Sequence, residues 1–398
     1  MTTTIAAPIP ASAFSVDSAA HIGTLFLSEQ DMVAAGVTDM AACVETMEEV
    51  FRCLGEGDFR MAGANGASHG AMVSFPEAPV HEGMPADGPD RRFMAMPAYI
   101  GGRFRATGVK WYGSNVENRV VGLPRSIHTF ILNDTVTGAP KAMMSANLIS
   151  AYRTGAVPGV GAKYFARPDA KVAGVVGPGV MGKTAVASFA AVCPLLDTVK
   201  IKGRGQASLE SFVEWVRREV PQIKNIVIVD TEEQAVRGSD LVTVTTTAPA
   251  GSENYPFLKH EWLKPGAFVA LPAMTNMDDE FLASDGVRLL VDYRGLYEAW
   301  QEEYAPDAFE TVGIIGNKFL QMEKSGALPD GKVEDIADVV REVAAGKSVG
   351  RTHDEDIIIM SVGGMPVEDV AWAQECYDRA RERGIGSMLT FWDEPALA

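Results

Sequence analysis

The stretch GPGVMGKT, residues 177–184, decides the fold because it matches two phosphate-binding patterns that belong to different folds. Read as G-x-G-x-x-G, it is the turn of a dinucleotide-binding βαβ unit, and read as G-x-x-x-x-G-K-T, it is the Walker A loop of a nucleoside triphosphatase. In a dinucleotide turn Gly177 bends the chain, Gly179 lets the pyrophosphate approach the backbone, and Gly182 lets helix and strand pack closely. A Walker A loop leaves Gly179 without a task, and Pro178 removes an N–H group from a loop that acts by donating them. The spacing therefore favours the dinucleotide turn.

The chain that follows Pro168 alternates between compact apolar runs and helical segments. Such alternation is typical of a doubly wound parallel sheet, and it predicts one that begins at about residue 170. The predicted strands are KVAGVV (171–176), TVKIKG (198–203), NIVIVD (225–230), DLVTVTTT (240–247), AFVALP (267–272) and VRLLVDY (287–293). Asp230 would end a Walker B strand in the triphosphatase interpretation, but apolar strands that end in Asp are common in any α/β sheet.

The chain before the glycine turn has a different pattern. Three runs bounded by Gly, Pro and Asn predict strands of an antiparallel or mixed sheet: RRFMAMPAYI (91–100), ATGVKWYGSN (106–115) and SIHTFILND (126–134). We expect two short helices within 26–57, with Ser28 as an N-cap, and a long loop or weak edge strands over 63–90. Residues 147–166 predict a helix interrupted near Pro158, and 367–384 predict an amphipathic helix that returns to pack on this first part.

Composition limits the possible partners. The 398 residues are 47% hydrophobic and carry a formal net charge of −17, which disfavours binding to nucleic acid or to anionic membranes. No window approaches the roughly 18 apolar residues that a membrane span needs. The four scattered cysteines include no C-x-x-C pair, so we expect no metal site, no disulfide framework and a cytoplasmic location.

The end of the second predicted strand bears on which nicotinamide cofactor is used. An NAD site normally has Asp or Glu there to accept from the ribose 2′-hydroxyl, whereas a 2′-phosphate needs a cation. Here Gly203 occupies that place, with Lys202, Arg204 and Ser208 nearby. The cofactor is thus predicted to be NAD(P), with NADP(H) slightly favoured over NAD(H). The alternative is that both cations belong to a solvated strand end.

Taken together, the motifs resemble the ornithine cyclodeaminase/mu-crystallin family, and within it the diaminopropionate-forming branch that contains aminocarboxyethyl-glutamate dehydrogenase. The order and spacing of the motifs, rather than any one of them, carry the resemblance. They are MPAYIGG (96–102), GVKW (108–111), SNVEN (114–118), GLP (122–124), LNDTVTGAPKA (132–142), RTGA (153–156), GPGVMG (177–182), EWLKPGA (261–267) and SVGGMPVEDVAWA (361–373).

The resemblance implies a fold class and a division into domains. The fold is α/β, with a Rossmann doubly wound dinucleotide-binding domain over 155–362. An α+β substrate-binding and dimerisation domain is built from 23–154 and 363–398, after a flexible N-terminal arm at 1–22. The implied protein is a homodimer that acts on a small amino-acid or imino-acid substrate.

The resemblance also assigns site residues. Lys110 and Arg153 match catalytic, substrate-binding positions, and a guanidinium offers an α-carboxylate a bidentate fork. Their alternative roles are a solvated lysine and a structural salt bridge. Asn118 and Met96 lie in substrate-binding motifs. The predicted cofactor-binding residues are Thr154, Gly177, Pro178, Gly179, Val180, Met181, Gly182, Lys202, Arg204, Thr246 and Ser361.

The sequence departs from the family pattern at two places. Cyclodeaminases carry an aspartate where Met274 stands, and Asp278, Asp279 or Glu280 would replace it only if the loop shifts. The family's additional arginine is not evident, and His69, His81, Arg91 and Arg92 are alternatives for it. The implied activity is therefore an NAD(P)-dependent oxidoreductase acting on the C–N bond of an amino acid, by amine oxidation or imine reduction. The alternatives are a cofactor-retaining cyclodeaminase and an NADP(H)-binding protein without turnover.

Overall fold

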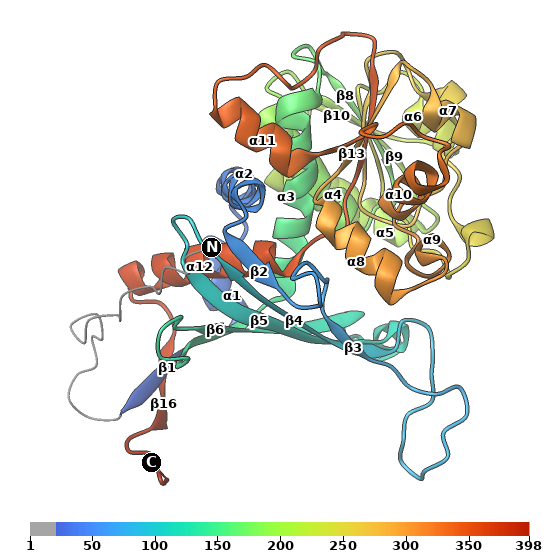
Figure 1. Cartoon of the computed structure of the whole chain (residues 1–398). Coiled ribbons are helices and arrows are strands. Elements are labelled where there is room, and N and C mark those ends of the chain that lie inside the picture. The colour runs from blue at the N-terminus through green and yellow to red at the C-terminus, as the bar shows by residue number, and fades with distance from the viewer. Residues whose placement is uncertain (1–20, 398) are drawn as a thin grey trace, which may run out of the picture.

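The strands of the computed structural model, which describes residues 21–397, form two separate eight-stranded sheets (Figure 1). Strands of the first sheet come from residues 22–145 and 387–392, and those of the second come from 172–361. The predicted arm at 1–22 lies outside the described residues apart from its last two positions, and Ile22 already belongs to a strand. No helix among residues 21–397 has the length and apolar character that a bilayer span requires.

The second sheet is the predicted doubly wound sheet. All of its strand pairs are parallel. From edge to edge it contains β10 (Asn225–Ile228), β9 (Thr198–Lys202), β8 (Val172–Val176), β11 (Leu241–Val244), β12 (Phe268–Leu271), β15 (Ile357–Ser361), β13 (Val287–Val291) and β14 (Val333–Asp335). The strand before the glycine turn, β8, is central, so chain order reverses beside it as in dinucleotide-binding sheets. Two strands of this sheet were not predicted: β14 at its edge, and β15, which enters the sheet between β12 and β13.

Helices cover both faces of this sheet (Figure 1). They are α4 (Val180–Val192), α5 (Gln206–Glu219), α6 (Glu232–Val236), α7 (Asp279–Ala283), α8 (Arg294–Glu303), α9 (Ala308–Val312), α10 (Gly316–Ser325) and α11 (Ile336–Ala344). Helix α4 begins directly after Gly179, its N-cap, which has no side chain to cap the helix. Its first N–H groups therefore face the turn.

The first sheet is the predicted mixed sheet, in which only β1 and β7 pair in parallel among the described strands. Its path is β16 (Ser387–Trp392), β1 (Ile22–Leu27), β7 (Pro140–Ser145), β6 (Ser126–Asn133), β5 (Ala106–Ser114), β4 (Arg92–Ile100) and β2 (Phe59–Met61), and β3 (Ala71–Val73) also pairs with β4. Helices α1 (Glu29–Ala34) and α2 (Met40–Glu56) match the two predicted helices, although α2 is long, and Ser28 caps α1.

Two long helices lie between the sheets, α3 (Asn147–Phe165) and α12 (Pro366–Arg383) (Figure 1). The predicted interruption of α3 is wrong, because the helix continues through Pro158. Its glycines pack against α4 so closely that a Cβ at Gly159 would lie 2.8 Å from the Ser188 side chain. We attribute the continuity to this packing, which outweighs the hydrogen bond lost at proline. The predicted domain boundary between residues 154 and 155 falls inside α3.

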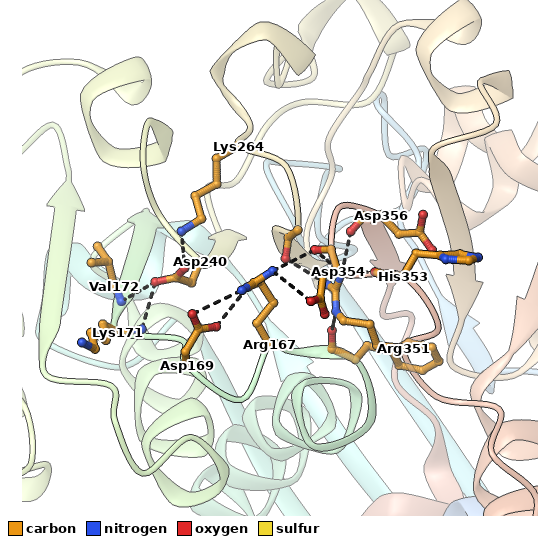
Figure 2. Close-up of polar contacts among 12 residues, drawn as sticks. Arg167, Asp169, Lys171, Val172, Asp240, Lys264, Arg351, His353, Asp354 and Asp356 are labelled. Carbon is orange, nitrogen blue, oxygen red and sulfur yellow. Dashed lines mark hydrogen bonds and ion pairs between the residues drawn. The ribbon is translucent and has the colours of Figure 1, made fainter.

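The amino ends of the second sheet are held by a polar cluster (Figure 2). The Arg351 guanidinium donates to the carbonyl oxygens of Phe165 and Asp356, both at 2.7 Å, and of Gly266 at 2.9 Å. Oδ2 of Asp240 accepts from the backbone N–H groups of Lys171 and Val172, both at 2.9 Å. Because this edge is opposite the glycine turn, the cluster fixes loops and leaves the carboxyl ends free for a site.

Candidate active site

The glycine turn has the geometry that a dinucleotide turn requires. Gly177 has φ 110°, and a Cβ there would lie 2.6 Å from Oγ1 of Thr245. A Cβ at Gly182 would collide with the Gly177 carbonyl oxygen, so the helix packs closely on the turn. At Gly179 a Cβ would meet no atom within 4 Å. Packing within the protein therefore requires glycine at positions 177 and 182. At Gly179 no protein atom fills the space, which leaves room for a ligand to approach the backbone.

The Walker A residues face away from this turn. Nζ of Lys183 donates to Oγ of Ser211 on α5 at 2.9 Å. Oγ1 of Thr184 donates to the Val180 carbonyl within α4 at 3.0 Å. A triphosphatase needs both side chains on the phosphates and the metal ion. The structure therefore agrees with the dinucleotide interpretation.

The other predicted cofactor residues surround the same sheet edge. Val180 is exposed and Met181 half-buried in the first turn of α4. Pro178 packs against Gly203, where a Cβ would lie 2.7 Å from the proline Cγ. Position 203 therefore has no room for a carboxylate side chain. Lys202 is half-buried and Arg204 exposed, and neither side chain makes an ion pair or hydrogen bond within residues 21–397.

Thr246 gives a direct test of whether the edge fits a cofactor. Its Oγ1 atom is buried and has no hydrogen-bond partner among the described residues, a state that native proteins avoid unless a ligand or water completes it. Thr154 is half-buried on α3, next to Gly155, which packs on Thr184 of α4. The residues present thus fit a dinucleotide, with the turn at its pyrophosphate and Thr246 as a ready hydrogen-bond partner.

Lys110 and Arg153, the two predicted catalytic residues, come together in a buried network of four charges. Nζ of Lys110 on β5 donates to Oδ2 of Asp369 at 2.8 Å and to Oγ of Ser150 at 3.2 Å. Arg153 on α3 donates from Nε to Oδ1 of Asp369 at 3.0 Å and from Nη1 to Oε2 of Glu368 at 2.7 Å. The side chains are 2% and 5% exposed for the cations and 0% for both acids. A solvated lysine is excluded, and Arg153 does make salt bridges.

The network still has unused hydrogen-bonding capacity. Nη2 of Arg153 has no hydrogen-bond partner among residues 21–397, and Oε1 of Glu368 is buried without a partner. Gly364, which follows β15, leaves room for the guanidinium, because a Cβ there would lie 2.5 Å from Nη1 of Arg153. Since β8 and β15 are parallel strands of one sheet, Arg153 lies at the same carboxyl edge as the glycine turn.

Burial shifts the protonation equilibria of the network. Burial and the neighbouring Arg153 lower the pKa of Lys110 to about 8, although Asp369 opposes the shift. Burial raises the pKa of Glu368 to about 7, against the effect of Arg153. The pKa of Asp369 is lowered, because the two cations outweigh its burial. A lysine and a glutamate that both titrate near neutrality are suited to proton transfer.

The two acids of this network were not predicted as site residues. Glu368 and Asp369 lie in the motif SVGGMPVEDVAWA, in the first turn of α12. Acidic residues in the first turn of a helix usually complement the helix dipole in solvent. The signal that could have revealed them is the apolar surroundings, since Val367, Val370 and Ala371 are all buried. Two adjacent acids in an apolar segment need cationic partners.

Among the four alternatives for the additional arginine, His69 lies nearest to the network. Its Nδ1 is 3.0 Å from the Gly364 carbonyl oxygen, and its ring lies 5.6 Å from that of Trp300. Burial, Lys110 and Arg153 lower its pKa to about 3, so it is neutral and does not replace a cation. Arg91 pairs with Glu117. Arg92 lies farther along the face of the sheet that carries Lys110.

The structure places the remaining predicted residues as follows. Met96 is buried and pairs with Lys110 across β4 and β5. Asn118 donates from its side chain to the Pro124 carbonyl at 3.1 Å, which stabilises its own loop. Ser361 is buried, and its Oγ accepts from the Tyr297 hydroxyl at 3.0 Å and from the Gly316 N–H at 2.8 Å. Of these three residues only Met96 lies beside Lys110, and the roles assigned to all three stay predictions.

Two of the three acids near Met274 are engaged elsewhere. Asp278 caps α7 by accepting from the Phe281 N–H at 2.9 Å. Asp279 pairs with Lys318 at 2.5 Å, and Glu280 is exposed. Met274 itself is half-buried beside Gly313. Asp278 and Asp279 are therefore not free to take the place of the missing aspartate.

Fold and site together define a class of protein: a doubly wound sheet with a dinucleotide turn, joined to a mixed sheet that contributes a buried lysine. The chain belongs to the ornithine cyclodeaminase/mu-crystallin family, whose model matches residues 36–384. It is 25% identical over 370 residues to N-((2S)-2-amino-2-carboxyethyl)-L-glutamate dehydrogenase of Staphylococcus aureus, covering 92% of this chain and 98% of that protein. The family, the branch and the fold class expected from the sequence are confirmed.

Two solved structures are similar over nearly the whole chain. Δ1-pyrroline-2-carboxylate reductase of Thermococcus litoralis, in complex with NADH and L-proline, has a TM-score of 0.72 and 25% identity, covering 92% of this chain and 99% of that one. An archaeal alanine dehydrogenase dimer with bound NAD has a TM-score of 0.71 and 25% identity, covering 93% and 100%.

Proposed function

We propose that this protein is an NAD(P)-dependent oxidoreductase that interconverts an amino acid and its imine, with Lys110 and Arg153 as catalytic residues. The relatives named above are dehydrogenases and a reductase of amino or imino acids, which bears out the enzyme class expected from the sequence. The observation that carries the proposal is the buried Lys110–Asp369–Arg153 network at the carboxyl edge of the dinucleotide sheet. A bound nicotinamide would supply the hydride donor or acceptor.

Arg153 binds the substrate α-carboxylate in this proposal. Its Nε and Nη1 are held by Asp369 and Glu368, so the guanidinium plane is fixed before a ligand arrives. The unpartnered Nη2 is then the group that meets the carboxylate. Preorientation matters because a misplacement of about 1 Å at a reacting carbon costs on the order of a hundredfold in rate.

Lys110 exchanges a proton with the substrate nitrogen. Its pKa of about 8 leaves both protonation states accessible near neutral pH. In the oxidative direction the neutral amine accepts a proton from the substrate ammonium, and in the reductive direction the ammonium returns one to the nitrogen. Asp369 holds Nζ in place, and the burial of both side chains excludes bulk water. Glu368, with a pKa of about 7, compensates by taking up a proton when a substrate carboxylate adds negative charge.

The cyclodeaminase alternative is disfavoured by the chemistry around Met274. A thioether offers no negative charge to support an amine during ring closure. Asp278 and Asp279 are engaged in a helix cap and an ion pair. The alternative of a binding protein without turnover is disfavoured by the lysine whose pKa lies near neutrality.

We infer a preference for NADP(H) from the end of β9. Position 203 has no room for the carboxylate that would accept from a ribose 2′-hydroxyl. Lys202 and Arg204 lie beside it without ion-pair partners among residues 21–397. In a chain of net charge −17, two adjacent unpaired cations favour a 2′-phosphate.

We also propose a homodimer formed through the first sheet. The face opposite Lys110 carries four large exposed apolar side chains, Phe93, Trp111, Ile127 and Met143, each 40–48% exposed. The Phe93 and Trp111 rings stack with centroids 5.8 Å apart. An exposed apolar face of this kind is typical of subunit interfaces. The similar archaeal enzyme is a dimer. The predicted division into a dinucleotide domain and a substrate and dimerisation domain is part of this proposal.

A cytoplasmic location remains a prediction, and we retain it. The four cysteines are free and buried. That state is the one expected of a chain that folds in a reducing compartment.

The test of the proposed function is turnover measured at the reduced-nicotinamide absorbance band. We expect the wild-type protein to change this absorbance with at least one L-amino acid or cyclic imino acid, and Lys110→Met to lose at least a hundredfold in kcat. Lys163→Met is the matched control, because Lys163 lies on α3 in an exposed pair with Glu48. A wild type that forms product without any absorbance change would favour the cyclodeaminase, and binding without product would favour the binding protein.

A further inference from the structure

The face of the first sheet that carries Lys110 continues in a row of polar side chains. Cross-strand pairing places Met94, Tyr112 and His128 in the row next to Lys110. The following row contains Arg92, Ser114 and Ser126. Because paired residues of adjacent strands share a face, all of these side chains lie on the Lys110 side of the sheet.

The Tyr112 ring connects the reacting end of this face to its far end. Nζ of Lys110 lies 5.8 Å from the ring centroid, and Cζ of Arg92 lies 5.9 Å from the same centroid. The His128 ring lies 4.7 Å from that of Tyr112. Nδ1 of His128 is buried and has no hydrogen-bond partner among the described residues. The middle row therefore offers an aromatic surface and an unused polar atom.

The far end carries more positive than negative charge. The Asp90 carboxylate is shared by two guanidinium groups, those of Arg92 and of Arg125 at 3.2 Å. Oγ of Ser114 donates to the same carboxylate at 2.5 Å. The side chains of Arg92 and Arg125 are 30% and 38% exposed, so both remain accessible to a ligand.

Two further observations concern the backbone and the charge of this cluster. Asp90 has φ 58°, in the left-handed region that aspartate adopts more readily than most residues with a Cβ, because its side chain can hydrogen-bond locally. Burial, followed by the proximity of Arg92 and Arg119, lowers the pKa of Arg125. Crowded cations in a chain of net charge −17 need an anion to offset their repulsion. Tyr304 follows α8, one of the helices that cover the second sheet, and it lies near both Arg92 and Tyr112. The far end is therefore bordered by residues from both parts of the chain.

We propose that Arg92 and Arg125 form a second anion-binding site, which selects substrates whose side chain ends in a carboxylate. The inference rests on the proposed function, since it assigns the α-carboxylate to Arg153 and the reacting nitrogen to Lys110. The substrate then extends along the Tyr112 ring from Lys110 to Arg92. His128 and Tyr112 contact the chain between its two ends.

The direct test uses probes that require no turnover. Glutarate and its monoamide glutaramate, in which a neutral amide replaces one of the two carboxylates, are titrated into the full chain with NADP⁺ present, and binding is measured by calorimetry. We expect glutarate to bind at least about tenfold more tightly, as a charge-assisted contact implies. Arg92→Met should reduce this preference to within about twofold. Arg237→Met is the matched control, because it removes an exposed arginine paired with Glu233 on the far sheet.

The outcomes separate this inference from the proposed function. Equal binding of the two probes by the wild type, or an undiminished preference in Arg92→Met, would overturn the second site. If Arg92→Met does not fold, the wild-type comparison and Arg125→Met decide in the same way. A glutarate preference without any turnover of L-glutamate, L-2-aminoadipate or their neutral amides would support the site while the oxidoreductase proposal fails.

Discussion

Asp369→Asn tests the buried network more sharply than loss of either cation. The Asp369 carboxylate accepts from Lys110 at 2.8 Å and from Arg153 at 3.0 Å, and its side chain is 0% exposed. Asparagine has nearly the same shape, but it is neutral and must direct an N–H group toward one of the two cations. Breaking a buried ion pair from one side costs about 3–5 kcal/mol. That cost is a large share of the about 5–15 kcal/mol that stabilises a folded domain.

The same substitution should shift the pH dependence of activity. Asp369 is the neighbour that raises the pKa of Lys110, against burial and Arg153, which lower it to about 8. Without the carboxylate this pKa falls, by about one unit or more for an opposite charge at this distance. Neutral Lys110 then becomes available at lower pH, so the alkaline rise in kcat/KM for amine oxidation should move toward acid.

The assays are urea unfolding followed by circular dichroism and a pH–rate profile of amine oxidation. Asp378→Asn on the same helix is the matched control, because Asp378 is exposed and its one hydrogen bond within residues 21–397 is accepted from Gln374. We expect the control to change the free energy of unfolding by less than about 0.5 kcal/mol. An Asp369→Asn protein with wild-type stability and an unmoved pH profile would refute the network as both a structural and a catalytic unit.

Four further substitutions test other parts of the structure. Lys183→Ala should keep NAD(P)H affinity within about twofold by fluorescence titration, because the lysine faces Ser211; complete loss would restore the Walker interpretation. Arg204→Ala should weaken NADPH binding by about 1–3 kcal/mol and leave NADH unchanged, and equal losses would contradict the 2′-phosphate contact. Arg351→Ala should lower the free energy of unfolding by about 2–4 kcal/mol without changing KM, because buried carbonyls lose their donors. His69→Gln should make the free energy of unfolding decrease less steeply as the pH falls. The folded chain keeps this histidine neutral between pH 3 and 6.5, where the unfolded chain protonates it, so stability present above 6.5 is lost as pH falls. An unchanged acid slope in urea midpoints would count against that role.

Local patterns were sufficient to predict the strands around the glycine turn and the three strands from β4 to β6. In each case the signal is a short run bounded by turn residues, and the partner strand is near in sequence. Two of the missed strands, β16 and β15, have distant partners. β16 pairs with β1 at the opposite end of the chain, and β15 joins β12 and β13 only after α11 has intervened. Pairing over such separations leaves no local trace in the sequence.

The α3 prediction was wrong for a related reason. A proline rule describes the cost at one position, but the packing that offsets it comes from α4, a separate segment. Gly155 and Gly159 allow α3 and α4 to approach closely at Thr184 and Ser188. The sequence shows these glycines but not the residues that pack against them. Tertiary packing therefore keeps α3 continuous at Pro158, although the helix propensity of proline predicts an interruption there.

The ion-pair partners at the candidate site were equally hard to predict from local sequence. The family resemblance was enough to single out Lys110 and Arg153, because both residues stand at matching positions of its motifs. Their partners lie more than 200 positions away, on α12. A buried cation without an acid is too costly to persist, so the existence of partners follows from physics, whereas their identity requires the fold. Because Asp369 joins a strand of the first sheet to α3, the contacts that hold the helices between the sheets are the same contacts that orient the two cations proposed as catalytic. We therefore expect stability and activity to be coupled through α12.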